Sequence, residues 1–129
     1  MSMGIKSKNL HLLVSTAVMV PIAGVYGLFP SHTLPPLFDF DVTTPDLKQV
    51  FRATMGLYCA MAALWIAGIS KPDYWKMATV SNICFMGGLV IGRCASLILD
   101  GIPSMYFITG LLLESIFFCW GLWNVKYIS

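Results

Sequence analysis

Three ionisable side chains, Arg52, Arg93 and Glu114, lie inside long apolar stretches of the sequence. An ionisable side chain within a membrane-spanning segment is costly, so it usually faces protein, water or a ligand. Arginine binds a carboxylate or phosphate through paired hydrogen bonds. At 100° per residue in a helix, Asn82, Arg93 and Asp100 share one face, which adds Asp100 to the candidate residues. We therefore expect Arg52, Arg93 and Glu114 to meet in one cluster, with Asp100 near it.

The composition indicates a helical membrane protein. Of the 129 residues, 57% are hydrophobic and 11% are charged, whereas a soluble domain carries about 25% charged residues. The net charge of +2 is small and dispersed, which argues against nucleic-acid binding. We predict a single all-α transmembrane domain over residues 1–129, without room for a separate soluble catalytic domain.

Four apolar stretches are long enough to cross a bilayer, which takes about 20 residues. They predict an integral membrane four-helix bundle with helices at residues 9–29, 46–69, 75–99 and 104–126. Residues 30–46 are proline-rich and predict a loop. At its end, Thr44 is a candidate N-cap and Pro45 occupies a typical first helical position.

The charges between the helices differ from one side to the other. Basic residues are expected on one side, at Lys6, Lys8, Lys71, Lys76 and Lys126, and acidic residues on the other, at Asp39, Asp41, Asp46 and Asp100. The positive-inside rule then places both termini in the cytoplasm. Tyr26 and Tyr106 are expected to mark the outer side. The default location is the bacterial inner membrane.

Small residues spaced by three or four form stripes that let membrane helices approach closely. The expected packing positions are Gly56, Ala60, Ala63, Gly88, Gly92, Ser96, Gly110 and Gly121. Arg52 precedes Gly56 by four residues, so we expect it to point into the bundle. With a rise of 1.5 Å per residue, both arginines lie roughly 9 Å below the outer helix ends, and Glu114 about 15 Å below.

Other reactive residue types show no catalytic pattern. Cys59, Cys84, Cys94 and Cys119 lie in apolar segments and are expected to be small packing residues. His11 and His32 fall on opposite sides of the membrane, so they cannot share a metal, and each is expected at an interface. We expect no metal and no cofactor. The sequence leans against an enzyme without deciding the question.

The segment Phe51-Arg52-Ala-Thr-Met-Gly56-Leu57-Tyr58, the motif Gly92-Arg93 followed by Asp100-Gly101-x-Pro103, and Glu114 form a recognisable set. This set resembles the small membrane family called domain of unknown function 4345. The resemblance covers nearly the whole chain and implies a four-helix membrane domain akin to DoxX-like proteins. It implies no activity. A fainter similarity, of architecture alone, is to the four-helix ergosterol-biosynthesis scaffold family.

The sequence leaves several functions open. The first is an accessory or scaffold subunit that packs in a larger membrane complex or self-associates, since the chain is small and shows no catalytic set. The second is a lipid- or quinone-binding protein, because two arginines against one carboxylate leave a surplus positive charge. The third is a small proton-coupled transporter that uses Glu114. The charged cluster could equally be a structural ion pair that fixes the helix register.

Overall fold

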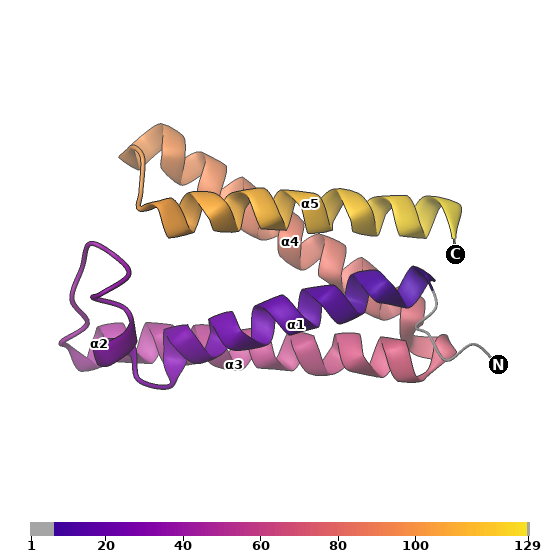
Figure 1. Cartoon of the computed structure of the whole chain (residues 1–129), viewed down its shortest axis with the longest axis horizontal. Coiled ribbons are helices and arrows are strands. Elements are labelled where there is room, and N and C mark those ends of the chain that lie inside the picture. The colour runs from indigo at the N-terminus through magenta and orange to yellow at the C-terminus, as the bar shows by residue number, and fades with distance from the viewer. Residues whose placement is uncertain (1–6, 129) are drawn as a thin grey trace.

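The structure, a computed structural model, describes residues 7–128, and this part of the chain is all-α. Its helices are α1 (Ser7–Gly27), α2 (Pro30–Thr33), α3 (Pro45–Ser70), α4 (Pro72–Asp100) and α5 (Met105–Tyr127) (Figure 1). All except α2 are long and apolar enough to cross a membrane. The all-α prediction is therefore confirmed, and the four long helices are consistent with a multi-pass membrane protein. Lys6 lies outside the described residues.

Prolines set where two of the long helices begin. Thr44 is the N-cap of α3, because its side chain accepts a hydrogen bond from the Leu47 amide at 3.2 Å. Pro45 then follows at the first helical position, where its missing N–H costs nothing. Pro72 opens α4 in the same way, so α4 begins at Pro72 rather than at residue 75. Lys71 alone separates α3 from α4.

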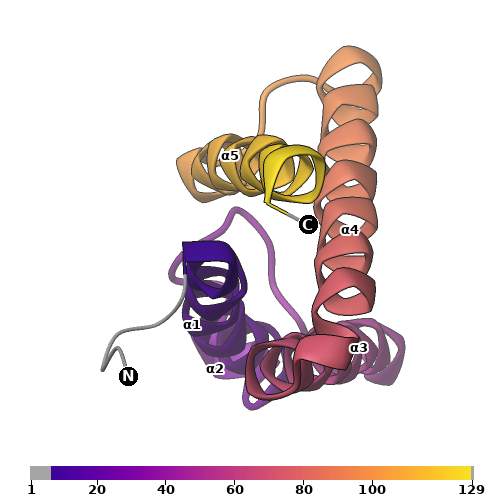
Figure 2. The same cartoon turned by 90° about the vertical axis from the view of Figure 1, so that its right-hand side faces the viewer.

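The long helices form two pairs. α1 packs along α3, and α4 packs along α5, while α3 and α4 are neighbours through their shared turn. Figure 2 shows α4 rising from α3 and passing α5, so its last turns stand far from α1 and α3. In Figure 1 the pairs diverge towards the end that carries α2. This divergence determines where the interior stays open.

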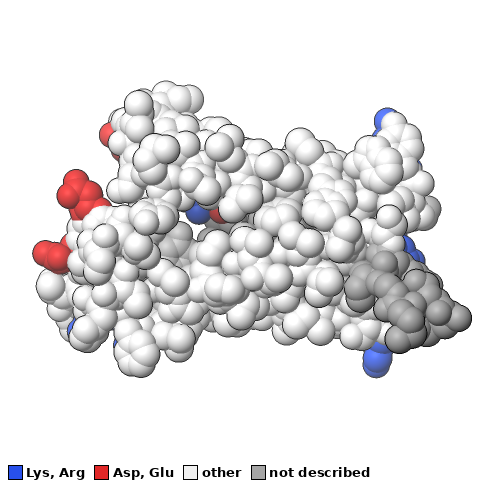
Figure 3. Space-filling model, in the orientation of Figure 1, with Lys and Arg blue, Asp and Glu red and all other residues white. Residues whose placement is uncertain are grey.

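The two ends of the bundle carry opposite charges. Figure 3 shows acidic atoms at the end where α2 and the following loop lie, and basic atoms at the opposite end. We call these the acidic end, which holds Asp39, Asp41 and Asp100, and the basic end, which holds Lys71, Lys76 and Lys126. Lys48 and Arg52 also belong to the acidic end, near the start of α3.

The small-residue stripes do not pack inside the chain as predicted. Gly56, Ala60 and Ala63 are exposed on α3, and so are Gly88, Gly92 and Ser96 on α4. A side-chain carbon added at Gly56, Gly88 or Gly92 would meet nothing within 4 Å. The buried face of α3 consists instead of Tyr58, Ala62, Trp65 and Gly68. Large aromatic side chains bury more apolar area than glycine and alanine, and they determine which face turns inward.

The cysteines also differ from their predicted role. Cys59, Cys84, Cys94 and Cys119 are all exposed on the surface of the chain.

Of the glycines predicted to pack between helices, only two have close neighbours. Gly110 lies against the Arg93 guanidinium, and Gly121 is buried beside His11 and Ile83.

Candidate functional site

The centre of the site is a bidentate ion pair between α4 and α5. Arg93 Nε donates to Glu114 Oε1 at 2.6 Å, and Nη2 donates to Oε2 at 3.0 Å. Glu114 is 3% exposed, so its carboxylate is held away from solvent. Within residues 7–128 this is the only ion pair. Such a forked geometry is the arrangement in which a buried charge pair is best compensated.

The hairpin between α4 and α5 brings the two charges to one level. Gly101 ends α4 with φ of +97°, a backbone conformation that favours glycine. Arg93 lies seven residues before Asp100, and Glu114 lies nine residues after the start of α5, so both are roughly 10–14 Å from the turn. Gly110 lies beside the guanidinium, where a side-chain carbon would contact Arg93 Nη2 at 3.5 Å.

Arg52 does not join the pair, contrary to prediction. Its Nη1 donates to the Gly27 carbonyl at 3.0 Å and to the Leu28 carbonyl at 3.2 Å. These carbonyls end α1, where the last turn lacks intrahelical donors. Arg52 is exposed and caps the neighbouring helix, because the packing of α3 on α1 sets its position beside that helix end.

Asp100 and Asn82 are also separate from the pair. Asp100 is exposed and accepts a hydrogen bond from Ser96 Oγ of its own helix at 2.8 Å. Asn82 is fully buried further towards the basic end. The predicted four-residue site is therefore one arginine and one glutamate. Its formal charge is zero, and the surplus positive charge expected from two arginines does not exist.

A cavity of about 250 Å³ lies next to the ion pair. Figure 3 shows a hollow between α1 and α5 with basic and acidic atoms visible inside it. Most of the wall is apolar. The lining residues are Met19, Ile22, Val25, Tyr26, Leu37, Phe38, Tyr58, Arg93, Tyr106, Thr109, Gly110, Leu113 and Glu114.

Two of the three tyrosines that line the cavity are in contact with each other. The rings of Tyr26 and Tyr58 meet edge to face at 5.9 Å, and both residues line the cavity with Arg93 and Glu114. We call these four residues the charged layer. Tyr26 was predicted only as a marker of the outer side. The spacing of Met19, Ile22 and Tyr26 by three and four residues is the signal that places it on the cavity face.

Aromatic side chains from the loop after α2 cover the cavity at the acidic end. Phe38 stacks on Phe107 of α5 with ring centroids 4.4 Å apart, and also on Phe40 at 5.8 Å. Phe40 in turn stacks on Phe51 of α3 at 5.7 Å. These contacts join the two helix pairs across their diverging ends. The loop therefore roofs the cavity towards the acidic end, and the hollow in Figure 3 lies on the side between α1 and α5.

A second polar layer lies towards the basic end. His11, Ser15, Thr79 and Asn82 are each 0% exposed, and we call them the neutral layer. The His11 ring donates from Nε2 to the Phe117 carbonyl at 2.9 Å. His11 is thus a buried residue between helices, whereas the sequence predicted an interfacial one.

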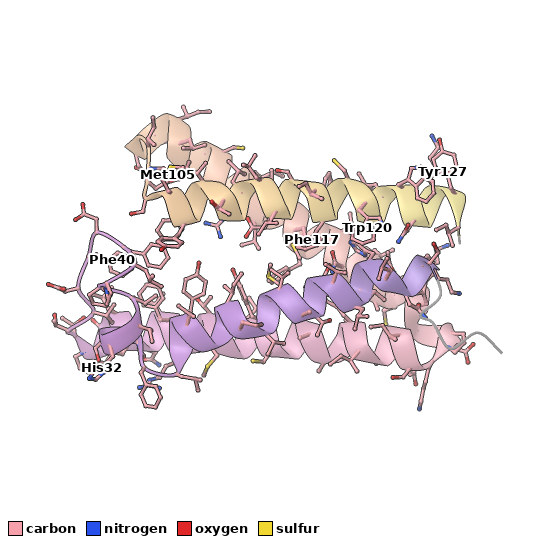
Figure 4. All side chains as sticks on the ribbon, viewed as in Figure 1. His32, Phe40, Met105, Phe117, Trp120 and Tyr127 are labelled. Carbon is pink, nitrogen blue, oxygen red and sulfur yellow. The ribbon has the colours of Figure 1, made fainter. Side chains whose placement is uncertain are left out.

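The charged and neutral layers are separated by Met19, Met86 and Phe117, which we call the apolar layer. These side chains are 0–3% exposed. In Figure 4, Phe117 and Trp120 extend from α5 into the space between α5 and α1. Among the described residues, no group of three or more His, Cys, Asp or Glu side chains could hold a metal ion.

Comparison with known proteins gives one match. The family model described as Domain of unknown function (DUF4345) matches residues 7–125, a range that includes both polar layers. No curated protein and no solved structure matches the chain.

Proposed function

The chain belongs to the family described as Domain of unknown function (DUF4345), and we propose that it is a membrane protein that binds a neutral amphiphile. The observation that carries this proposal is the apolar cavity whose wall contains the Arg93–Glu114 pair. Concave apolar sites with a few convergent polar groups are the usual form of small-molecule sites.

The proposed setting is the bacterial inner membrane, with the basic end in the cytoplasm. Four long apolar helices support a multi-pass arrangement. The separation of acidic and basic residues between the ends supports this orientation through the positive-inside rule. In this setting the hollow between α1 and α5 faces the lipid. The stacked rings of Phe38, Phe40 and Phe107 separate the cavity from the external aqueous phase.

The charge balance of the site favours a neutral head group. Glu114 compensates Arg93, so an anionic head would bring an uncompensated charge into an apolar cavity. The guanidinium carries five N–H donors, and the ion pair uses those of two nitrogens. Further donors therefore remain on Arg93 and on the hydroxyl groups of Tyr26 and Tyr58. A carbonyl or hydroxyl oxygen of a ligand could accept from them.

The size of the cavity indicates how much of the ligand it encloses. An apolar cavity of about 150 Å³ holds one benzene ring, so 250 Å³ suits one substituted ring or a short chain segment. The remaining tail would pass through the opening between α1 and α5 into lipid. Two sources share this chemistry: a membrane quinone, and a lipid with an uncharged hydroxyl head such as diacylglycerol.

Native mass spectrometry of the protein in mild detergent tests the proposal. We expect added decylubiquinone or dioleoylglycerol to bind at one copy per chain, and which of them binds more tightly identifies the source. Ile22→Trp places a large ring in the cavity and should abolish binding. Val20 lies on the same helix outside the cavity, and it is 44% exposed. Val20→Trp is therefore the matched control and should bind normally. Equal binding to both variants, or preferential binding of oleate, would contradict the proposal.

A second candidate is an accessory subunit of a larger membrane complex. It is favoured by the exposed position of Gly88, Gly92 and Ser96, which forms a surface suited to close contact with another helix. Gly92→Leu should then reduce the mass of the complex purified in mild detergent. An unchanged monomeric mass for wild type and variant would argue against this role. Proton-coupled transport has less support, because Arg93 engages both oxygens of Glu114.

A further inference from the structure

We infer a second binding site at the start of α3, where Lys48, Gln49 and Arg52 bind the phosphate group of an anionic membrane lipid. The site goes beyond the proposed function, since none of these residues lines the cavity beside Arg93. It shares with that function only the membrane setting. The two sites therefore differ in position and in the charge of the head group that each of them takes.

An open depression of about 620 Å³ lies on the surface of α3. Two cationic side chains and one amide form its polar part, and the lining residues are Pro45, Lys48, Gln49, Arg52 and Ala53. Residues three and four apart in a helix are neighbours on its surface. Arg52 therefore adjoins both Lys48 and Gln49, so that all three polar groups can reach one ligand.

The two cations of this site lack an acidic partner. The sole ion pair within residues 7–128 joins Arg93 to Glu114, so neither Lys48 nor Arg52 is paired with a carboxylate. Asp46 belongs to the first turn of α3, but a step of two residues turns a helix by about 200°, which places Asp46 on the side opposite Lys48. Like charges four residues apart repel each other. An anion bound between them would remove this repulsion.

The Arg52 guanidinium is held in place and still has donors to offer. Its Nη1 donates to the carbonyls of Gly27 and Leu28 at the end of α1. Its Nε and Nη2 make no hydrogen bond to the part of the chain that the structure describes. The fork of donors on a guanidinium matches the oxygens of a phosphate. Because α1 already orders this side chain, little conformational freedom is lost when an anion binds.

The cationic groups lie near the level of the lipid head groups in the proposed membrane setting. α3 has 26 residues, so it is about 39 Å long and exceeds the hydrocarbon core of about 30 Å. Its start therefore extends into the head-group region, and Lys48 is only three residues from that start. Arg52 lies one turn deeper, beside the residues where α1 ends. Long cationic side chains near helix ends commonly reach the interface.

Below the two cations, the surface of α3 leaves room for an acyl chain. Gly56 and Ala60 follow Arg52 by four and eight residues on the same face, and both are exposed. A side-chain carbon added at Gly56 would meet nothing within 4 Å. With the phosphate at Lys48 and Arg52, one chain of the lipid can therefore lie along this face. This continuity favours a lipid over a soluble phosphate.

The charge of the site selects an anionic head group. Lys48 and Arg52 together carry two positive charges, and hydrogen bonds between ionised groups are roughly twice as strong as neutral ones. Phosphatidylglycerol presents a phosphate that no cation of its own balances. Phosphatidylcholine carries a trimethylammonium group, which the two side chains would repel. The Gln49 amide can donate to a phosphate oxygen or accept from a glycerol hydroxyl.

Photocrosslinking of the full chain in nanodiscs tests the inference. The probe is phosphatidylglycerol with a diazirine on one acyl chain, at a concentration that leaves most sites empty. We expect labelling to concentrate on residues 53–63 of α3, and phosphatidylcholine with the same diazirine to label them much less. Each basic residue near an anionic lipid head contributes about five-fold in affinity, so Lys48→Gln should lower the labelling about five-fold and Lys48→Gln with Arg52→Gln about 25-fold.

The matched control is Lys76→Gln with Lys126→Gln, which removes two positive charges at the basic end and should leave the labelling of residues 53–63 unchanged. Equal labelling by the two lipids, or unchanged labelling in the double variant of α3, would overturn the inference. Protection by inorganic phosphate at constant ionic strength would also overturn it, because the site would then take a soluble anion. If Arg52→Gln does not fold, Lys48→Gln alone leaves the hydrogen bonds of Arg52 intact and provides the same comparison. None of these outcomes depends on amphiphile binding at Arg93.

Discussion

The charged layer and the neutral layer both contain residues of α1 and α4, yet they satisfy their polar groups differently. In the charged layer, both carboxylate oxygens of Glu114 are bound by Arg93. In the neutral layer, five side-chain atoms have no hydrogen-bond partner within residues 7–128. An unpaired buried charge costs far more than an unpaired amide or hydroxyl. The chain therefore pairs its buried charges directly, whereas these neutral groups are buried without a hydrogen-bond partner among the described residues.

The divergence of the helix pairs adds a second difference. At the charged layer the pairs stand apart, which leaves the cavity of about 250 Å³. At the neutral layer Trp75 and His11 tie α4 and α5 to α1. One layer is therefore accessible from the side of the bundle, and the other is enclosed.

The largest effect is expected from Glu114→Gln, which leaves the Arg93 charge buried without its carboxylate. Loss of one partner from a buried ion pair costs about 3–5 kcal/mol of unfolding free energy. The double variant Arg93→Met with Glu114→Leu removes both charges and should be more stable than Glu114→Gln alone. Unfolding in mixed micelles compares the stability of the wild type with that of both variants. A double variant less stable than the single one would show that the layer does not act as a compensated pair.

Phe117→Ala should have the next largest effect, because it opens the apolar layer that separates the two polar layers. Truncation of a buried phenylalanine costs about 3 kcal/mol or more. Unfolding in mixed micelles measures this loss. The matched control is Ile116→Ala, whose side chain is 58% exposed and should change little. Equal effects of the two variants would mean that Phe117 forms no boundary.

Arg52→Ala should lower stability by about 1–2 kcal/mol, because two helix-end carbonyls lose a charged donor. Amphiphile binding measured by native mass spectrometry should not change, since Arg52 lies outside the cavity. Arg52→Lys keeps a single donor and should recover part of the loss. Weaker amphiphile binding in Arg52→Ala would instead show that Arg52 contributes to the site together with Arg93 and Glu114.

Asp100→Asn should have the smallest effect. Asp100 is exposed and bonded to Ser96 of its own helix, and surface substitutions of this kind usually change stability by less than about 0.5 kcal/mol. Thermal unfolding and amphiphile binding should both match the wild type. A loss of binding would indicate that the charged layer extends to the end of α4.

Much of the fold follows from local sequence signals. The Thr44 cap and the prolines at the starts of α3 and α4 act within one helical turn, so their effects are readable in the sequence. The pairing of Arg93 with Glu114 was predicted from the cost of burying charge. This reasoning works because the chain contains few other groups that could compensate Arg93.

The positions of the other predicted site residues depend on which face of each helix turns inward. Helical periodicity puts Asn82, Arg93 and Asp100 on one face, but the tilt of α4 separates them along the bundle into an enclosed, a cavity-lining and an exposed position. α5 is apolar on all sides, so its sequence does not single out the buried face. The prediction for Arg52 is wrong for the same reason, since the small residues near it do not mark the inner face of α3.

The sequence by itself determined the class of protein, the approximate positions of four apolar helices, the charge difference between the ends and the need for Arg93 to find a carboxylate. These properties follow from composition, local backbone preferences and the free energy of burying charge. Only the tertiary structure decided that Arg52 caps α1, that three tyrosines line the cavity and that His11 and Asn82 are fully buried. Those outcomes depend on how helices cross, and the crossing is set by contacts between residues far apart in the chain, such as Trp75 with Lys8.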